Sequence, residues 1–434
     1  MGARMNATST RTTHNRTPLL ALLSANTISQ IGSMLTVIAV PWFVLQTTGS
    51  AAKTGLTSVF EALPFIIAGV FGGTLVDRLG FKRTSILADI TSGLTVALIP
   101  LLYHTVGLAF WQLLALAFLG NLFNTPGNTA RQSLVPELAE IAGMRLERAN
   151  SVVQTVPRIA ILLGPPLAGV LIAVIGASNV LWLDAATFAV SAVLIGALIP
   201  SLAGSGTDER TPGRYFADLL EGLRFIWDDR VIRATSILFA VGNFLDAPIG
   251  LLFAVYASRK YASAVPVGLI FAALGAGAVI GSLTFGAVGH RWSRRAIFVC
   301  YCIPVAGMYA TFAFSPPLAV VLVAVFIDGL AVGPVNPLSA TITQERVPVA
   351  LRGRVQGMRT AVSFMAIPLG RGLAGVLVDP VGLRAIFVTI AGSFLLVSLG
   401  TALAPAFRDL RAPGGDAPVS RSRDARVASE FPSA

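Results

Sequence analysis

Five ionisable residues lie inside long apolar stretches of this sequence: Glu61, Arg158, Asp246, Asp328 and Arg371. Charged side chains are rare in such surroundings and mark paths for protons, ions or substrates. The carboxylates suit proton carriage or contact with a cation, and for Asp246 a structural pair with an arginine is the alternative. The two arginines suit an anionic partner.

Two amides extend this set. Asn26 and Gln30 lie on one face of the first apolar stretch. They are expected either to line a cavity or to make hydrogen bonds between helices, which polar side chains also do in membranes.

The sequence carries no cluster of residues typical of an enzyme. The three histidines, His14, His104 and His290, are far apart, and Cys300 and Cys302 lie in an apolar run as expected buried thiols. No G-x-x-x-x-G-K-[ST] loop for nucleotide phosphates is present. We therefore expect no catalytic residue, no metal and no cofactor.

Composition indicates the elements that hold these residues. The chain has 434 residues, of which 54% are hydrophobic and 12% charged, whereas soluble domains carry about 25% charged residues. The net charge of +11 would otherwise suggest nucleic acid. Its bases fall in short clusters between apolar runs, which indicates membrane topology instead, so the expected surroundings are a lipid bilayer and no nucleic acid.

Twelve stretches are long and apolar enough to cross a bilayer, which takes about 20 residues. The sequence therefore predicts an all-α membrane protein with twelve transmembrane helices. Their expected ranges are 19–47, 54–76, 84–104, 107–130, 149–175, 179–200, 232–257, 265–289, 296–314, 318–343, 355–379 and 382–404.

The basic residues predict the orientation. If the helices alternate from a cytoplasmic N-terminus, most of the 32 Lys and Arg residues fall on the cytoplasmic side. The exceptions are four bases in outer loops and two within spans: Lys53, Arg259, Lys260, Arg384, Arg158 and Arg371. This asymmetry follows the positive-inside rule and predicts that both ends are cytoplasmic.

The twelve helices form two related halves of six. GPPLAGVLIAVIG at residues 164–176 resembles GRGLAGVLVDPVG at 370–382, an offset of 206 residues. Between them, 201–231 is polar and ends in an expected amphipathic surface helix. The predicted order is an N-terminal tail (1–16), a first half (17–200), this linker, a second half (232–405) and a disordered tail (406–434). Duplicated halves are typical of transporters that bind substrate near the midplane.

One charged stretch, GGTLVDRLGFKR at residues 72–83, resembles the motif between helices 2 and 3 of the major facilitator superfamily. Residues 286–295 are a degraded copy in the second half. GPPLAG resembles the family's antiporter motif in helix 5. Three further stretches, VPEL…ERANSV, EGLRFIWDDRVIR and RGRVQGM, resemble the branch that contains the enterobactin exporter and macrolide-efflux proteins.

The resemblance implies roles for the motif residues. In the family, the helix 2–3 motif latches onto the cytoplasmic end of helix 11 and holds the outward-facing state. The corresponding residues are Gly73, Asp77, Arg78, Gly80, Lys82, Arg83, Arg352 and Arg354. The alternative is a plain turn anchored by basic residues. Gly164, Pro165 and Gly169 represent the antiporter motif, with a simple packing kink as the alternative.

The fourth helix departs from drug antiporters of the family, which carry an arginine within it. Here the helix holds three asparagines, and Arg131 is expected only at its cytoplasmic end. Asp89 and Asp184 lie nearer the ends of their spans and are expected to cap helices or lie at interfaces.

The resemblance and the residues together predict a secondary transporter in a bacterial-type cytoplasmic membrane, acting as a monomer by alternating access. The expected activity is proton-coupled export of an amphipathic small molecule: a drug, a macrolide or a siderophore. One alternative is an importer or facilitator of a small anionic metabolite, which Arg158 and Arg371 would suit. Another is a membrane sensor with a transporter-like body.

Overall fold

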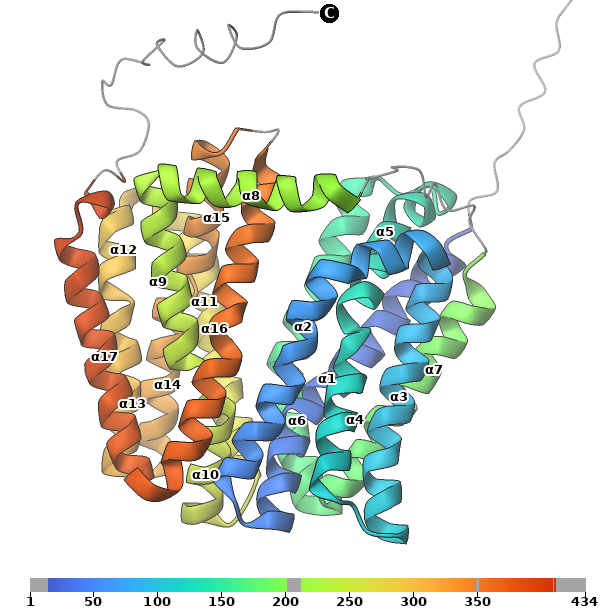
Figure 1. The fold of residues 1–434 in the computed structure, drawn as a ribbon, viewed down its shortest axis with the longest axis horizontal. Helices are drawn as coiled ribbons and strands as arrows, with labels where there is room; N and C mark the ends of the chain where they lie inside the picture. Colours follow the sequence, from blue (N-terminus) through green and yellow to red (C-terminus); the bar gives the residue numbers. More distant parts are fainter. Residues whose placement is uncertain (1–14, 201–211, 349–350, 409, 411–434) are drawn as a thin grey trace, which may run out of the picture.

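The computed structural model describes residues 15–200, 212–348, 351–408 and 410. Both expected tails, apart from residues next to the helices, and the start of the linker lie outside this part. Within it, the regular structure is helical (Figure 1).

The first half consists of seven helices. They are α1 Thr17–Thr48, α2 Ala51–Leu79, α3 Phe81–Thr105, α4 Phe110–Leu122, α5 Asn124–Ile141, α6 Leu146–Ile175 and α7 Ala177–Leu198. The linker helix α8, Pro212–Asp228, lies across one end of the bundle (Figure 1).

The second half contains the remaining helices. They are α9 Arg230–Asp246, α10 Ile249–Tyr261, α11 Val265–Val288, α12 Arg294–Cys300, α13 Cys302–Phe314, α14 Leu318–Val332, α15 Val335–Arg346, α16 Arg352–Val381 and α17 Leu383–Leu403. A short 3₁₀ turn at Gly289–Arg291 follows α11, and another at Pro405–Phe407 follows α17.

Four of the twelve expected spans are broken helices: α4–α5, α9–α10, α12–α13 and α14–α15. Each break comes one to three residues before a proline: Pro126, Pro248, Pro304 and Pro334. Proline lacks the backbone N–H and its ring clashes with the carbonyl four residues earlier, so the helix kinks there.

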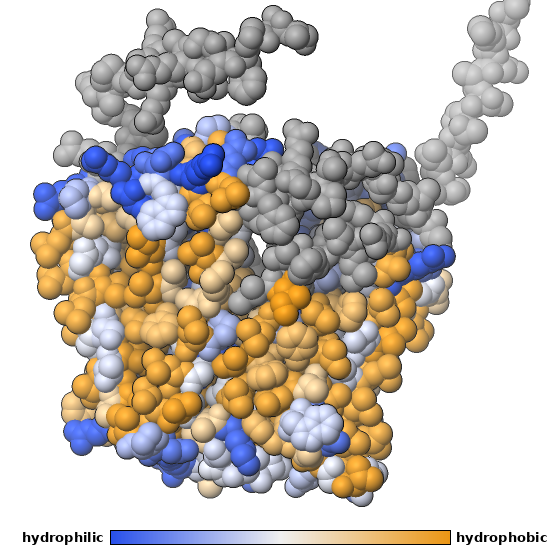
Figure 2. Space-filling model, in the orientation of Figure 1, coloured by the Kyte–Doolittle hydropathy of each residue, from blue (hydrophilic) through white to orange (hydrophobic). Residues whose placement is uncertain are grey.

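The surface fits a membrane. Ten helical segments of the described chain are long and apolar enough to cross a membrane. Together with α2 and the α4–α5 pair, they account for the twelve expected spans. Figure 2 shows apolar residues across the middle of the viewed face and hydrophilic residues toward both ends. Large apolar side chains such as Val193, Leu283 and Leu396 are exposed, as expected for contact with lipid.

The two halves pack together at the end away from α8 (Figure 1). There α2 crosses α16 at Gly55 and Gly375, and a Cβ on Gly55 would lie 2.6 Å from the Gly375 Cα. A second crossing joins α6 to α11, where a Cβ on Gly268 would lie 2.5 Å from the Pro165 carbonyl oxygen. Small residues allow these backbones to touch.

The sequence repeat reappears in these contacts. Gly164 packs α6 against Met34 of α1, and its repeat partner Gly370 packs α16 against Phe244 of α9. Gly176 and Gly382 join the last two helices of each half with the same unusual backbone, φ 82° and φ 89°. The duplication therefore explains the two-half architecture.

Candidate functional site

A cavity of about 550 Å³ lies within the second half. Helices α9 and α13 to α17, with Tyr301 between α12 and α13, contribute to its wall through these residues: Phe239, Gly242, Asn243, Asp246, Tyr301, Val305, Asp328, Val332, Val335, Asn336, Ser339, Ala340, Gln356, Arg359, Thr360, Ser363, Phe364 and Phe394. The wall thus combines aromatic and aliphatic surface with amides, two carboxylates and one guanidinium. Such a mixture is typical of small-molecule sites.

The two carboxylates are Asp246 and Asp328, which the sequence had placed in separate spans. Asp246 ends α9 and accepts a hydrogen bond from the Tyr309 hydroxyl at 2.6 Å. Asp328, on α14, is only 3% exposed, and its buried Oδ1 has no hydrogen-bond partner among the residues that the structure describes. A buried carboxylate oxygen without a donor is unfavourable as a charge, and a bound proton or cation relieves that cost.

Arg359 is the site residue that sequence reasoning missed. The charge pattern of the sequence groups it with the cytoplasmic bases, but it lies two turns inside α16 and is 6% exposed. Its guanidinium lies over the Phe239 ring, 6.0 Å from the ring centre, and both residues line the cavity. The available clue was its position inside the expected span 355–379.

Arg371 bridges the two halves at the end away from α8. Its guanidinium donates to the backbone oxygens of Ala247 in α9–α10, at 3.3 Å, and of Ser58 in α2, at 3.1 Å. Glu61 of α2 is near enough to Arg371 for their charges to attract each other. Neither Glu61 nor Arg371 lines the second-half cavity; they belong to the contact between the halves.

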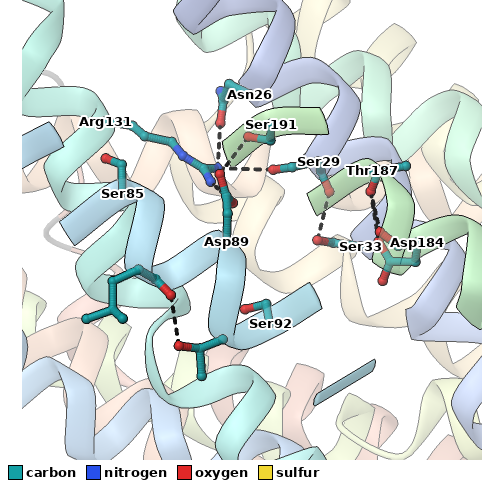
Figure 3. A network of polar contacts seen from close by, with 12 residues as sticks. Asn26, Ser29, Ser33, Ser85, Asp89, Ser92, Arg131, Asp184, Thr187 and Ser191 are labelled. Atoms are coloured by element: carbon teal, nitrogen blue, oxygen red, sulfur yellow. Dashed lines mark hydrogen bonds and ion pairs between the residues drawn. The ribbon is translucent and has the colours of Figure 1, made fainter. Parts of the chain in front are cut away.

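The first half contains a buried ion pair between Asp89 on α3 and Arg131 on α5 (Figure 3). The Ser191 hydroxyl donates to Asp89 at 2.7 Å, and Arg131 donates to Ser29 at 3.1 Å and to Asn26 at 3.4 Å. Arg131 does not lie at a helix end as expected, because α5 continues to Ile141 and the arginine side chain is buried beside α1 and α3.

The other polar residues of this half lie at helix contacts. Asn26 joins the ion-pair network, as the hydrogen-bonding alternative predicted, and Gln30 is half-buried on the same helix. Asp184 on α7 accepts hydrogen bonds from Thr36 of α1 and from Thr187. Asp89 and Asp184 are therefore interface residues.

The helix 2–3 motif lies where α2 meets α3. Gly80 joins the helices with φ 77° and ψ 159°, a conformation open to glycine. Lys82 donates to the backbone oxygens of Gly196 and Ile199 at the end of α7, at 2.9 and 2.6 Å. In the degraded copy, Arg295 donates to Ala402 at the end of α17. The motif base thus caps the last helix of each half.

In the described conformation, the two arginines expected to take part in the latch contact α15 and α8. Arg352 donates to backbone oxygens near the end of α15, and Arg354 forms an ion pair with Glu221 of α8. Arg83 is exposed. The side chains of Asp77 and Arg78, and that of Arg158 in α6, lie outside the described part of the chain, and Gly73 is described only as part of α2.

The antiporter-like motif lies in an unbroken helix. α6 continues through Pro157, Pro165 and Pro166. Gly164 faces α1, and Gly169 faces α11, where its added Cβ would lie 2.9 Å from the Ala264 oxygen. The motif therefore packs α6 against both halves.

Comparisons with known proteins agree with this architecture. A family model described as the Major Facilitator Superfamily matches residues 22–262 and 249–431. The multidrug efflux pump Tap of Mycolicibacterium fortuitum is 34% identical over 405 residues, which cover 92% of this chain and 98% of that protein. Macrolide efflux protein A of Streptococcus pyogenes is 23% identical over 379 residues, covering 85% and 91%.

The solved structure of the nucleoside transporter NupG has the same fold. It superposes with a TM-score of 0.72 at 14% identity and covers 92% of this chain and 100% of that one. The two packed halves, the repeat and these matches lead to one conclusion: the chain belongs to the major facilitator superfamily of membrane transporters.

Proposed function

We propose that this chain is a proton-coupled exporter of amphipathic small molecules. The observation that carries the proposal is the cavity wall, where Asp246 and the partnerless Oδ1 of Asp328 adjoin aromatic surface. The carboxylates offer an exchangeable place for a proton or a cationic group. Similarity to a multidrug efflux pump and a macrolide efflux protein supports the export direction and the substrate class.

The charge asymmetry of the sequence supports an orientation with α8 and both chain ends in the cytoplasm of a bacterial cell. In that orientation the glycine crossings at Gly55–Gly375 and Pro165–Gly268 close the external side. The described conformation then faces inward, and export requires these crossings to part. Alternating access between two such states is the general mechanism of duplicated transporters.

The family latch belongs to the opposite state. Asp77 would pair with Arg352 or Arg354 at the cytoplasmic face once the external crossings open. The variant Asp77→Asn keeps the size of the side chain but removes its charge. We expect it to reduce transport while the amount of protein in the membrane is unchanged; full activity would exclude the latch.

The function is tested in inverted membrane vesicles with an acidic interior. Erythromycin, a hydroxamate siderophore and a cationic dye are each offered outside, and accumulation is measured with and without an uncoupler. We expect at least one compound to accumulate and the uncoupler to abolish this. Accumulation that persists with uncoupler would contradict proton coupling, and no accumulation of any of them would contradict the substrate class.

A further inference from the structure

The buried guanidinium of Arg359 is surrounded by hydroxyl groups. It donates to Ser339 Oγ at 2.9 Å, to Ser236 Oγ at 3.2 Å and to Thr235 Oγ1 at 3.4 Å, and it also donates to Thr343. Arginine has five N–H donors. In the described part of the chain these contacts occupy four, which leaves one N–H of Nη1 for a ligand.

The surrounding hydroxyls accept hydrogen bonds from the guanidinium but carry no negative charge that would neutralise it. Those of Thr235, Ser236 and Thr343 each donate their own proton to the backbone oxygen four residues earlier, at 2.7 to 2.9 Å. Their oxygens can therefore only accept from the guanidinium. Within the described chain, no carboxylate lies at ion-pair distance from Arg359.

The first half contains a buried arginine that is paired with a carboxylate, which allows a comparison with Arg359. Arg131 also contacts a hydroxyl from the first helix of its half, that of Ser29, but it is neutralised by Asp89. Ser29 and Thr235 are repeat partners at the offset of 206 residues. An unneutralised buried charge is costly, and of these two arginines it is Arg359 that lines the cavity.

We propose that Arg359 binds an anionic group, such as a carboxylate, on the transported molecule. This inference rests on the proposed function, because it takes the cavity to be the substrate site. Ser236, which contacts the guanidinium, and Asp246 are ten residues apart on α9, a rise of about 15 Å along the helix, so Arg359 and Asp246 lie at different depths. The cavity therefore has an anion-binding end near α8 and a cation- or proton-binding end at depth.

The test compares two dyes that differ at one group: rhodamine B, with a free carboxylate, and its ethyl ester. Their affinities for purified protein in nanodiscs are measured by equilibrium dialysis. In Arg359→Gln we expect the ratio of acid to ester affinity to fall about tenfold, since a hydrogen bond to a charged group is lost. In Arg359→Lys, which keeps the charge, the ratio should fall less.

The control is Arg259→Gln, an exposed arginine paired with Asp379 at 3.1 Å, where the ratio should not change. An equal loss for both dyes in Arg359→Gln, or no loss, would overturn the inference and indicate a packing role. If this variant does not fold, wild-type protein decides: sodium benzoate should displace rhodamine B better than sodium chloride does, and equal displacement would contradict the inference. Failure of the proposed function is distinct, because it appears as absent uncoupler-sensitive transport.

Discussion

The crossing of α2 and α16, which we propose closes the external side, gives the sharpest prediction, for the variant Gly375→Ala. The added methyl group would lie 2.8 Å from the Gly55 Cα and 3.4 Å from the Ala51 backbone oxygen. Carbon atoms in contact rest about 3.5 to 4.0 Å apart. Since both close neighbours are backbone atoms, no side chain can turn aside, and the helices must separate by about 1 Å.

This separation breaks the adjacent contact between the halves. The Arg371 hydrogen bond to the Ser58 oxygen is 3.1 Å long, and a contact stretched beyond about 3.6 Å is no longer a hydrogen bond. Losing a hydrogen bond from a charged donor costs about 1.5 to 3 kcal/mol. The closed state of this crossing should therefore become about tenfold to a hundredfold less favourable relative to the proposed open state.

The assay measures access to this contact from outside. Val59 faces Gly372 across the crossing, so Val59→Cys is introduced with Cys300 and Cys302 replaced by serine. A membrane-impermeant maleimide should label Cys at this position at least tenfold faster when Gly375→Ala is present. The matched control is Gly392→Ala on α17, where a Cβ meets no described atom within 4 Å. An unchanged labelling rate in folded protein would refute the reasoning.

Two further variants test the folded state through the thermal stability of purified protein. Asp89→Ala leaves Arg131 buried without its anion and should cost about 3 to 5 kcal/mol; an unchanged unfolding midpoint would contradict the role of this pair. Gly80→Ala forces a side chain into φ 77°, ψ 159° and should cost about 1 to 3 kcal/mol, so a midpoint equal to that of the control Gly392→Ala would show that the turn is unstrained.

The spans were predictable because the thickness of the bilayer sets the length of an apolar run. The positions at which the helices break were not predictable. Pro157, Pro165 and Pro166 remain inside the intact α6, whereas Pro248 and Pro334 follow breaks. Proline alone does not determine the outcome, since neighbouring helices decide whether the freed backbone groups find partners.

The sequence indicated individual candidate residues, but it did not indicate which of them lie together in one site. Asp246 and Asp328 stood out as carboxylates in apolar runs, and both line the cavity. Glu61 stood out in the same way but interacts electrostatically with Arg371 at the contact between the halves. Which helices meet depends on packing between distant segments, which a single sequence does not display.

The sequence did not indicate Arg359 as a site residue, for a related reason. It follows Arg352 and Arg354 closely, so the sequence groups it with these bases at the membrane surface. Seven residues correspond to about 10 Å along a helix, enough to carry it from the surface into the buried interior. The hydroxyls that accept its hydrogen bonds come from two other helices, α9 and α15.

The most direct test of the central claim is proton release on substrate binding. Erythromycin is added to purified protein in a weakly buffered solution, and the change in pH is recorded for wild type, Asp328→Asn and the control Asp379→Asn, an exposed carboxylate. We predict proton release from wild type and from Asp379→Asn, and a loss of most of that release in Asp328→Asn. Release of the same size in Asp328→Asn would contradict the account.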